Sequence, residues 1–554
     1  MAGSTDPRDP DGLISGWVAE YERQPASASA ADTVIVPPPA QPMSVARHIV
    51  EALYTDPAGL VLRDFRGDFH GYDGTSWPEL DRRQVRADAY NYLEHAVYEK
   101  ETNNGITMEP WAPTRHKIDN VVDALRAIVM LDGSDPPMWT AHPTEPPAHE
   151  IISMRNGLLH VPTRRLYEHT PTYFTQHALP FDFDPDAPAP TEWISFLAEL
   201  WNDDLSSIGA LQEVFGYLLG GDTRLQKIFL LVGPRRAGKG TIGRVLTGLL
   251  GAHNVAAPTM AGLATNFGLQ PLIGKPLGLI SDARLSGRAN GQIVVERLLS
   301  ISGEDSLTID RKYREPWTGR LPTRFLILTN ELPQLSDSSG ALASRFILFV
   351  LTKSFLGRED PRLTDRLLEE ASGIFNWGLA GLDRLNDRGY FVPPQSGREA
   401  MQQLEDLSSP VSAFVRERCE LAADRSVAVD DLWNAWKRWC EEDNRHPGTK
   451  AGFGRDLKAT APTIRKARPR DDGDRIYSYE GIGLAENTLH GPRDHPDQDG
   501  RSGQRSGVWS GRRSGQNPSN DAAGPSGPGT NAPLFDRDEL AERAHALGFD
   551  GGDR

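Results

Sequence analysis

The most continuous hydrophobic runs lie in the centre of the chain. Four short, almost entirely apolar runs alternate there with stretches in which apolar residues recur every three or four positions. The runs are residues 228–232, 277–281, 324–329 and 346–351. Continuous apolar runs are typical of strands covered on both faces, and helical stretches between them indicate crossover connections. Residues 205–400 are therefore predicted to form an α/β domain with a parallel sheet.

Upstream of this centre, residues 43–204 show a mixed pattern. Short apolar runs flank Gly67, and another pair flanks residues 162–164, so each pair predicts a hairpin. Between the hairpins, a helical face is predicted by the spacing of Val85, Ala89, Leu93 and Val97. We expect an α+β accessory region here.

Downstream, residues 408–485 are predicted to form a winged-helix DNA-binding domain. Trp433, Trp436 and Trp439 recur every three residues, which predicts the buried face of a helix. The residues that follow read as helix, strand, polar turn and strand. Basic residues gather in this stretch, and we expect them to bind duplex DNA. They are Arg455, Lys458, Arg465, Lys466, Arg468 and Arg470.

The two ends of the chain differ from the rest in composition. Residues 1–42 include a stretch rich in Ala, Ser and Pro, and residues 486–554 are rich in Gly, Ser, Arg, Asp and Pro. Such segments contain too few large apolar residues to offset the entropy of ordering them. We expect a disordered arm and a disordered tail, with one short amphipathic helix near the end of the tail.

Composition limits the classes of protein that remain. The chain has 60 basic and 76 acidic residues, a net charge of −16, which excludes a uniformly basic nucleic-acid binder. Cys419 and Cys440 are too few for a disulfide framework or a four-cysteine zinc module. The N-terminus lacks the pattern of a secretory signal, and no run of roughly 18 apolar residues could span a bilayer. We expect a cytoplasmic protein without membrane contact.

A glycine-rich loop follows the first apolar run and opens a helical stretch. It consists of Gly233, Pro234, Arg235, Arg236, Ala237, Gly238, Lys239, Gly240 and Thr241. This is the context of a Walker A motif, in which backbone N–H groups and a lysine bind the phosphates of ATP. Gly240 stands where Ser or Thr usually binds Mg²⁺, and the hydroxyl comes one place later, at Thr241. Adenylate-kinase-like enzymes share this GKGT ending, so the loop alone leaves a motor ATPase and a nucleotide kinase open.

Three polar residues next to the other central runs are candidates for the same chemistry: two follow a run, and the third directly precedes the fourth run. Asp282 could hold Mg²⁺ together with Thr241, or polarise the attacking water. Asn330 could sense the γ-phosphate. Arg345 could reach the nucleotide of a neighbouring subunit as an arginine finger. Each has a plainer alternative: a strand-end cap, a turn former and a solvated charge, respectively.

The motifs GPRRAGKGT, LGLISDARL, SGEDSLTIDRKY and FLILTNELP with SRF occur in this order. Together they resemble superfamily 3 helicases of the phage and plasmid primase-helicase group, relatives of the poxvirus helicase-primase. Two upstream segments, NGLLHVPTRRLYEH and LQEVFGYLLGG, resemble the lead-in of that group. The resemblance therefore covers about residues 45–480. It implies an AAA+-like core that assembles as a ring, usually a hexamer, and moves along single-stranded DNA using ATP.

The resemblance also assigns individual residues. It places Asp282 at the Walker B position, where many relatives have Glu, and it places Arg311 and Lys312 on a DNA-contacting hairpin. Ser344 occupies a position often filled by a second arginine, so the finger would be Arg345 alone. About 200 residues precede the ATPase core, and their best match is the lead-in of the helicase and not a primase domain, so we expect no primer synthesis by this chain.

The sequence therefore predicts an ATP-hydrolysing DNA helicase that acts in phage, prophage or plasmid replication in a bacterial cell, together with other replication proteins. Two alternatives stay open. One is a P-loop nucleotide or small-molecule kinase, which would need an arginine-rich lid. The other is a DNA-binding replication initiator whose ATP site only drives assembly.

Overall fold

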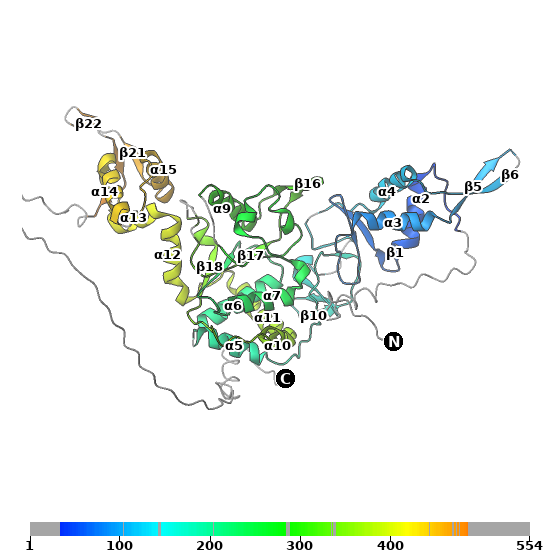
Figure 1. Cartoon of the computed structure of the whole chain (residues 1–554), viewed down its shortest axis with the longest axis horizontal. Coiled ribbons are helices and arrows are strands. Elements are labelled where there is room, and N and C mark those ends of the chain that lie inside the picture. The colour runs from blue at the N-terminus through cyan, green and yellow to red at the C-terminus, as the bar shows by residue number, and fades with distance from the viewer. Residues whose placement is uncertain are drawn as a thin grey trace, which may run out of the picture. The chain divides into compact units, whose positions relative to one another are not determined.

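The computed structural model describes residues 34–485, except for 104, 134, 142–145, 203, 284–287, 334, 336–339, 443, 468–469, 472–473 and 476. The predicted tail and most of the predicted arm lie outside these residues. The chain divides into two compact units (Figure 1). One unit is Met1–Ala148 with Glu168–His177, and the other is His149–Tyr167 with Ala178–Arg554. None of the described helices is long and apolar enough to cross a membrane.

The first unit packs three helices against each other beside small antiparallel hairpins. Its helices are α2 (Pro42–Leu53), α3 (Arg82–Leu93) and α4 (Arg115–Val129). Its strands are β1 (Thr55–Asp56), β2 (Gly59–Leu60), β3 (Leu62–Phe65), β4 (Asp68–Gly71), β5 (Val97–Thr102), β6 (Gly105–Pro110), β7 (Met138–Trp139) and β11 (Tyr173–Phe174). Apolar side chains of all three helices, among them Ile49, Leu93 and Leu125, share one core. This is the predicted α+β pattern, and β3 and β4 form the hairpin expected around Gly67.

Two predictions in this unit are wrong in detail. The helix predicted from Val85 to Val97 ends at Leu93, and Val97 begins β5. The predicted arm is ordered over residues 34–42, because the Val36 N–H donates to the Val97 carbonyl at 2.9 Å and α2 begins at Pro42. The hydrogen bond to Val97 holds this segment in place, although its composition predicted disorder.

The second unit is built around a five-stranded parallel sheet. Its order is β13-β14-β17-β12-β18. The strands are β12 (Ile228–Val232), β13 (Val255–Ala256), β14 (Leu277–Ile280), β17 (Arg324–Thr329) and β18 (Phe346–Val350). The four strands predicted from the sequence are confirmed. The two-residue strand β13 is too short to leave a pattern in the sequence.

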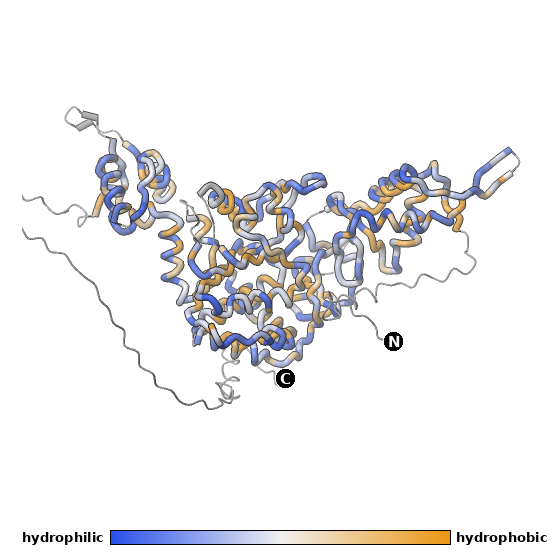
Figure 2. The backbone as a smooth tube through the Cα atoms, in the orientation of Figure 1, coloured by the Kyte–Doolittle hydropathy of each residue, from blue (hydrophilic) through white to orange (hydrophobic). Residues whose placement is uncertain are grey.

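Alternate side chains of the sheet enter two separate cores. On one face, Phe229 and Leu231 pack with α5 (Thr191–Trp201), α6 (Leu205–Leu219), α7 (Lys239–Leu250) and α11 (Ala371–Arg388). On the other face, Ile228 and Leu230 pack with α8 (Met260–Leu263), α9 (Arg288–Ser302) and α12 (Arg398–Ser408). Figure 2 shows the hydrophobic stretches of this unit concentrated in its interior. Burial on both faces explains why the strands read as continuous apolar runs.

The remaining elements of this unit lie before, beside and after the sheet. They are β8 (Ile151–Met154), β9 (Gly157–His160), β10 (Arg165–Tyr167), β15 (Leu307–Arg311), β16 (Arg314–Gly319), α10 (Leu363–Glu369), α13 (Pro410–Arg418), β19 (Cys419–Glu420), β20 (Ser426–Ala428), α14 (Val429–Glu442), α15 (Lys450–Thr460), β21 (Arg465–Ala467), β22 (Arg470–Asp471), β23 (Asp474–Arg475), β24 (Ser478–Glu480) and β25 (Gly483–Leu484). Strands β9 and β10 form the second predicted hairpin.

After α12 the chain forms a small helical region with its own core. Trp436 and Trp439 of α14 are buried there and stack with ring centroids 5.3 Å apart, and Trp433 is half-buried beside them. The predicted buried face is therefore confirmed. From α15 to β24 the helix and the two strands follow in the predicted order, and the short strands β22 and β23 lie where a polar turn was predicted.

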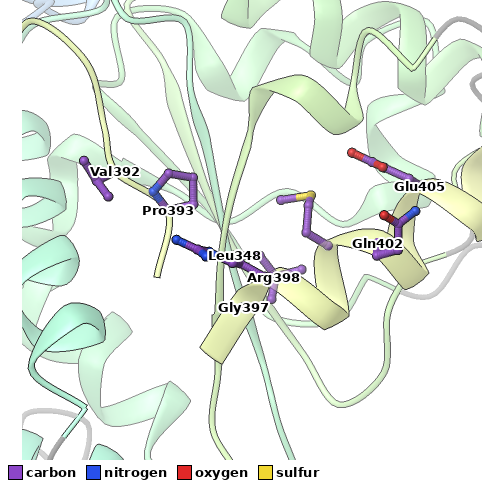
Figure 3. Close-up of a pocket in the computed structure, with 8 residues that line it drawn as sticks. Leu348, Val392, Pro393, Gly397, Arg398, Gln402 and Glu405 are labelled. Atoms are coloured by element: carbon purple, nitrogen blue, oxygen red, sulfur yellow. The ribbon is translucent and has the colours of Figure 1, made fainter. Parts of the chain in front are cut away.

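A cavity of about 270 Å³ lies between β18 and α12 (Figure 3). Leu348 lines it from the sheet, Val392 and Pro393 from the segment after α11, and Gln402 and Glu405 from α12. None of the residues that line this cavity belongs to the glycine-rich loop or to the other candidate site residues.

Candidate functional site

The glycine-rich loop joins β12 to α7, and two of its glycines have no room for a side chain. A Cβ at Gly233 would lie 2.5 Å from the Leu351 carbonyl oxygen, and one at Gly238 would lie 2.7 Å from Leu200 Cδ2. Gly238 also has a φ of +84°, which favours glycine. The chain therefore turns tightly here and directs the start of α7 towards the space enclosed by the loop.

The outer half of the loop is held by a segment that carries no recognisable motif. Phe355 N donates to the Arg236 carbonyl at 2.9 Å, and Ser354 Oγ donates to the Arg235 carbonyl at 2.9 Å. Glu359 lies 3.4 Å from Arg236 Nε. Both arginines are exposed. The loop is thus braced from outside by residues that follow the last strand of the sheet.

Lys239 is the most buried cation of the loop, with 8% of its surface exposed. Its Nζ donates to the carbonyl oxygens of Gly233 at 2.6 Å and Pro234 at 2.7 Å, and to Asn330 Oδ1 at 3.2 Å. Burial lowers the pKa of the Lys239 ammonium. A cation held at the first residue of a helix, beside the positive end of the helix dipole, is suited to bind an anion.

The structure brings Asn330 and Asp282 to the same edge of the sheet. Asn330 directly follows β17, the neighbour of β12, and contacts Lys239. Asp282 follows β14, which pairs with β17 so that Ile280 lies opposite Ile327. Both polar side chains are exposed. The carboxyl ends of three adjacent parallel strands therefore carry the loop, the amide and the carboxylate, which is where open α/β sheets bind ligands.

Thr241 has a partner that the sequence did not indicate. Its side chain is 9% exposed and accepts a hydrogen bond from Arg244 Nη2 at 3.1 Å. Arg244 Nε also donates to Thr364 Oγ1 of α10 at 3.0 Å. The only signal for this arrangement is that positions three apart on a helix are neighbours. Among the described residues, no group of three or more His, Cys, Asp or Glu side chains is placed to hold a metal ion.

Arg345 directly precedes β18 and is half-buried. It lies at the amino ends of the parallel strands, whereas the glycine-rich loop lies at their carboxyl ends. Its Nη1 donates to the Leu299 carbonyl at 2.6 Å and to Ser302 Oγ at 2.7 Å, both at the end of α9. Lys227 Nζ donates to the Ser344 carbonyl at 2.8 Å, and burial together with the charge of Arg345 lowers the pKa of Lys227. A second cation, Lys227, therefore lies beside Arg345. The sequence did not indicate it, because Ser344 occupies the position where a second arginine is often found.

The hairpin of β15 and β16 separates the two cations that were predicted to act on DNA together. Arg311 is 8% exposed, and its Nε donates to the Glu315 carbonyl at 2.8 Å. Lys312 is exposed at the tip, with its Nζ 5.2 Å from the ring centroid of Tyr313, which is 91% exposed. The Arg311 side chain folds back onto its own hairpin, so the predicted contact with DNA would require it to leave the Glu315 carbonyl.

The basic residues of the C-terminal region are placed as predicted at the surface. Arg455 and Lys458 lie on α15, Arg465 and Lys466 lie on β21, and all four are exposed. Lys466 Nζ lies 4.9 Å from the ring centroid of Tyr477. Arg468 and the side chain of Arg470 lie outside the described part of the chain.

Three family models match separate parts of this chain. Residues 48–202 match the family described as D5 N terminal like, and residues 408–473 match Poxvirus D5 protein-like. Residues 231–345, which include the glycine-rich loop and Arg345, match a family of unknown function, DUF5906.

Solved structures of the NrS-1 C terminal region share a similar arrangement at low identity. One apo structure, of residues 305–718 of that protein, has a TM-score of 0.45 at 13% identity, covering 78% of this chain and 98% of that one. An A form apo structure has a TM-score of 0.43 at 13% identity, covering 76% of this chain and 97% of that one.

The two D5-like matches lie on either side of the glycine-rich loop, within residues 45–480, over which the sequence resembles that group. The predicted resemblance to relatives of the poxvirus helicase-primase is thereby confirmed over these two parts of the chain.

Proposed function

We propose that this chain is an ATP-dependent DNA helicase of superfamily 3 that unwinds DNA during phage, prophage or plasmid replication. One observation carries the proposal: Lys239 of the glycine-rich loop contacts Asn330 across two adjacent strands, at the carboxyl edge of a parallel sheet. A lysine joined to a strand-end amide is suited to bind a terminal phosphate and to respond to its loss. The D5-like relationship supports the same class of activity.

The residues present fit ATP and Mg²⁺. Residues 233–241 would form the P-loop, with Lys239 exchanging its three oxygen partners for phosphate oxygens. Mg²⁺ usually keeps several waters and needs only one or two protein ligands beside the phosphates, so Thr241 and Asp282 suffice as candidates. When bound, Mg²⁺ would neutralise charge that develops on the phosphates. Asp282 would orient the attacking water and Asn330 would hold it near the γ-phosphate.

The DNA contacts divide between two regions. Lys312 would neutralise a backbone phosphate, and the face of Tyr313 would meet a base of single-stranded DNA. Residues 408–485 would form a winged-helix domain that binds duplex DNA through four exposed cations. These are Arg455, Lys458, Arg465 and Lys466.

The proposed helicase acts as a ring of several copies of this chain. Residues 205–400 would form an AAA+-like core, with residues 43–204 as the associated domain, and six copies would close a ring in which Arg345 reaches a neighbour's nucleotide. For that, Arg345 must leave the Leu299 carbonyl and Ser302. The ring would act in the cytoplasm of a bacterial host beside other replication proteins.

ATP turnover with and without single-stranded DNA tests the proposal. Stimulation by DNA, together with unwinding of a forked duplex, is the expected result. Transfer of phosphate to a nucleotide or another small molecule would make the chain a kinase. ATP binding without turnover would make it an initiator that uses ATP only for assembly.

A further inference from the structure

The space beside Gly240 is taken by an arginine. Gly240 is exposed, and a Cβ built on it would lie 3.2 Å from Arg244 Nη1. The same guanidinium donates to Thr241 Oγ1 through Nη2 and to Thr364 Oγ1 through Nε. Residues three and four apart on a helix face each other, so Arg244 covers the first turn of α7. Two hydrogen bonds fix the guanidinium over Gly240 and Thr241.

This is the position at which other P-loops place a metal ligand. The residue after the P-loop lysine usually supplies the hydroxyl that binds Mg²⁺. Here that residue is Gly240, and Thr241 points about 100° further around the helix. The Thr241 hydroxyl is also nearly buried and accepts a hydrogen bond from Arg244. A fixed cation therefore stands where the metal-binding hydroxyl is usually found.

We propose that Arg244 binds the nucleotide phosphates directly and supplies charge that Mg²⁺ supplies in other P-loops, so that ATP binds this chain almost independently of Mg²⁺ while hydrolysis still requires it. The proposal rests on the assignment of the loop to ATP. A guanidinium presents paired N–H donors that match phosphate oxygens. The start of a P-loop helix is where the α- and β-phosphates lie, which brings them within reach of Arg244.

A purely structural role would be to join α7 to α10 through Thr364. The two roles differ in what they predict for Mg²⁺. A structural pin acts on the fold of the loop, so its loss would weaken ATP binding equally with and without the metal. A phosphate-binding arginine and Mg²⁺ both neutralise the same phosphates, so loss of the arginine would be felt most when the metal is absent.

The experiment measures the Kd of the full chain for ATP by calorimetry, in MgCl₂ and in EDTA at matched ionic strength. For the wild type we expect the two Kd values to differ by less than about tenfold. Arg244→Ala should weaken binding in EDTA by about tenfold or more, the scale of one hydrogen bond to a charged group, with a much smaller change in MgCl₂. Arg244→Lys should recover part of the loss, because it keeps the charge.

Two further variants separate the roles. Thr364→Val removes the hydrogen bond to α10 and keeps the guanidinium, so its Kd values should match those of the wild type in both buffers. Gly240→Ser combined with Arg244→Ala restores the usual hydroxyl, and it should bind ATP well only with Mg²⁺. If Arg244→Ala does not fold, Arg244→Lys takes its place, and a weaker Kd in EDTA with a nearly unchanged Kd in MgCl₂ is the expected result.

The proposal is overturned if the wild type binds ATP only with Mg²⁺, or if Arg244→Ala loses the same factor in both buffers. Absence of ATP binding by the wild type in either buffer would instead remove the proposed function, so the two failures are distinguishable.

Discussion

Two loops of the second unit each carry a lysine, and they present it in opposite ways. In the glycine-rich loop, Lys239 is 8% exposed and donates to three oxygen atoms, and burial lowers its pKa. At the tip of the β15–β16 hairpin, Lys312 is exposed and lies over the ring of Tyr313, which is 91% exposed. Lys239 is enclosed by its own chain, and Lys312 is exposed to solvent.

The difference indicates what each loop can bind. An enclosed ammonium can exchange its carbonyl and amide partners for the oxygens of a small anion that fits inside the loop. An exposed ammonium next to an aromatic face can contact a long polyanion, which cannot enter such a loop. Salt screens exposed charges more than buried ones, so the two sites should also respond differently to ionic strength.

The largest expected effect comes from Lys239→Ala. The variant keeps the glycines of the loop and loses the ammonium that donates to the Gly233 and Pro234 carbonyls and that, in the proposed function, holds the phosphates. ATP turnover should therefore be abolished while circular dichroism stays unchanged. Lys312→Ala is the matched control, because it removes a lysine from the same unit and should leave basal turnover intact. Hydrolysis by Lys239→Ala at the wild-type rate would contradict the assignment of the loop.

The next effect concerns Arg345. If it acts as a finger across a subunit boundary, Arg345→Ala should still bind ATP but hydrolyse it more slowly by a factor on the order of a thousand, as for other arginine fingers. Mixing this variant with Lys239→Ala should recover part of the turnover, because some interfaces then pair an intact loop with an intact arginine. Turnover that does not recover under conditions in which rings form would exclude action across the boundary.

A second variant checks the contacts that Arg345 makes in its own chain. Ser302→Ala removes one acceptor of the guanidinium and keeps the arginine. If Arg345 works on a neighbour's nucleotide, Ser302→Ala should hydrolyse ATP at close to the wild-type rate. A loss as large as that of Arg345→Ala would show that its role is to hold α9 to the start of β18.

The sequence predicted the sheet well, because strands covered on both faces have to be apolar at every position. It also predicted that Asp282 and Asn330 follow two of the strands, and the structure brings them to the same side of the sheet as the loop because parallel strands have their carboxyl ends together. It failed at Val97, where the spacing continued a helical pattern past the end of α3 into a strand. The spacing of apolar residues indicates which positions are buried and not which element they belong to. An apolar residue at the start of a strand can therefore continue the spacing of the helix before it.

Side-chain direction was beyond the sequence. Arg311 and Lys312 are adjacent, yet the pleat of the hairpin and the turn at its tip send only Lys312 outward. The roles of Arg244 and Lys227 follow from their contacts with Thr241 and Ser344. Such roles depend on partners distant in sequence or on rotamers, neither of which a residue pattern encodes.

The two neighbours on the hairpin should therefore differ in stability. Arg311→Ala removes a buried guanidinium that donates to the Glu315 carbonyl, and it should cost about 1–3 kcal/mol of unfolding free energy. Lys312→Ala removes an exposed side chain and should cost less than about 0.5 kcal/mol. Urea unfolding followed by tryptophan fluorescence measures both, and Trp317 lies buried in the same hairpin. Equal costs would contradict the different burial of the two side chains.

The smallest effect is a change of slope, and it decides which of the two cations meets DNA. Each contact between a cation and a single-strand phosphate contributes about 0.7 to the dependence of log K on log salt. Lys312→Ala should lower that slope by about 0.7. Adding Arg311→Ala should lower it no further, because Arg311 already donates to its own hairpin. Both variants should keep basal ATP turnover and lose its stimulation by DNA.

A slope lower by about 1.4 in the double variant would mean that Arg311 leaves Glu315 and takes a phosphate of its own. An unchanged slope in Lys312→Ala would mean that the tip of the hairpin is a solvated turn that does not contact DNA. The contrast between the enclosed and the exposed lysine would then bear only on nucleotide binding.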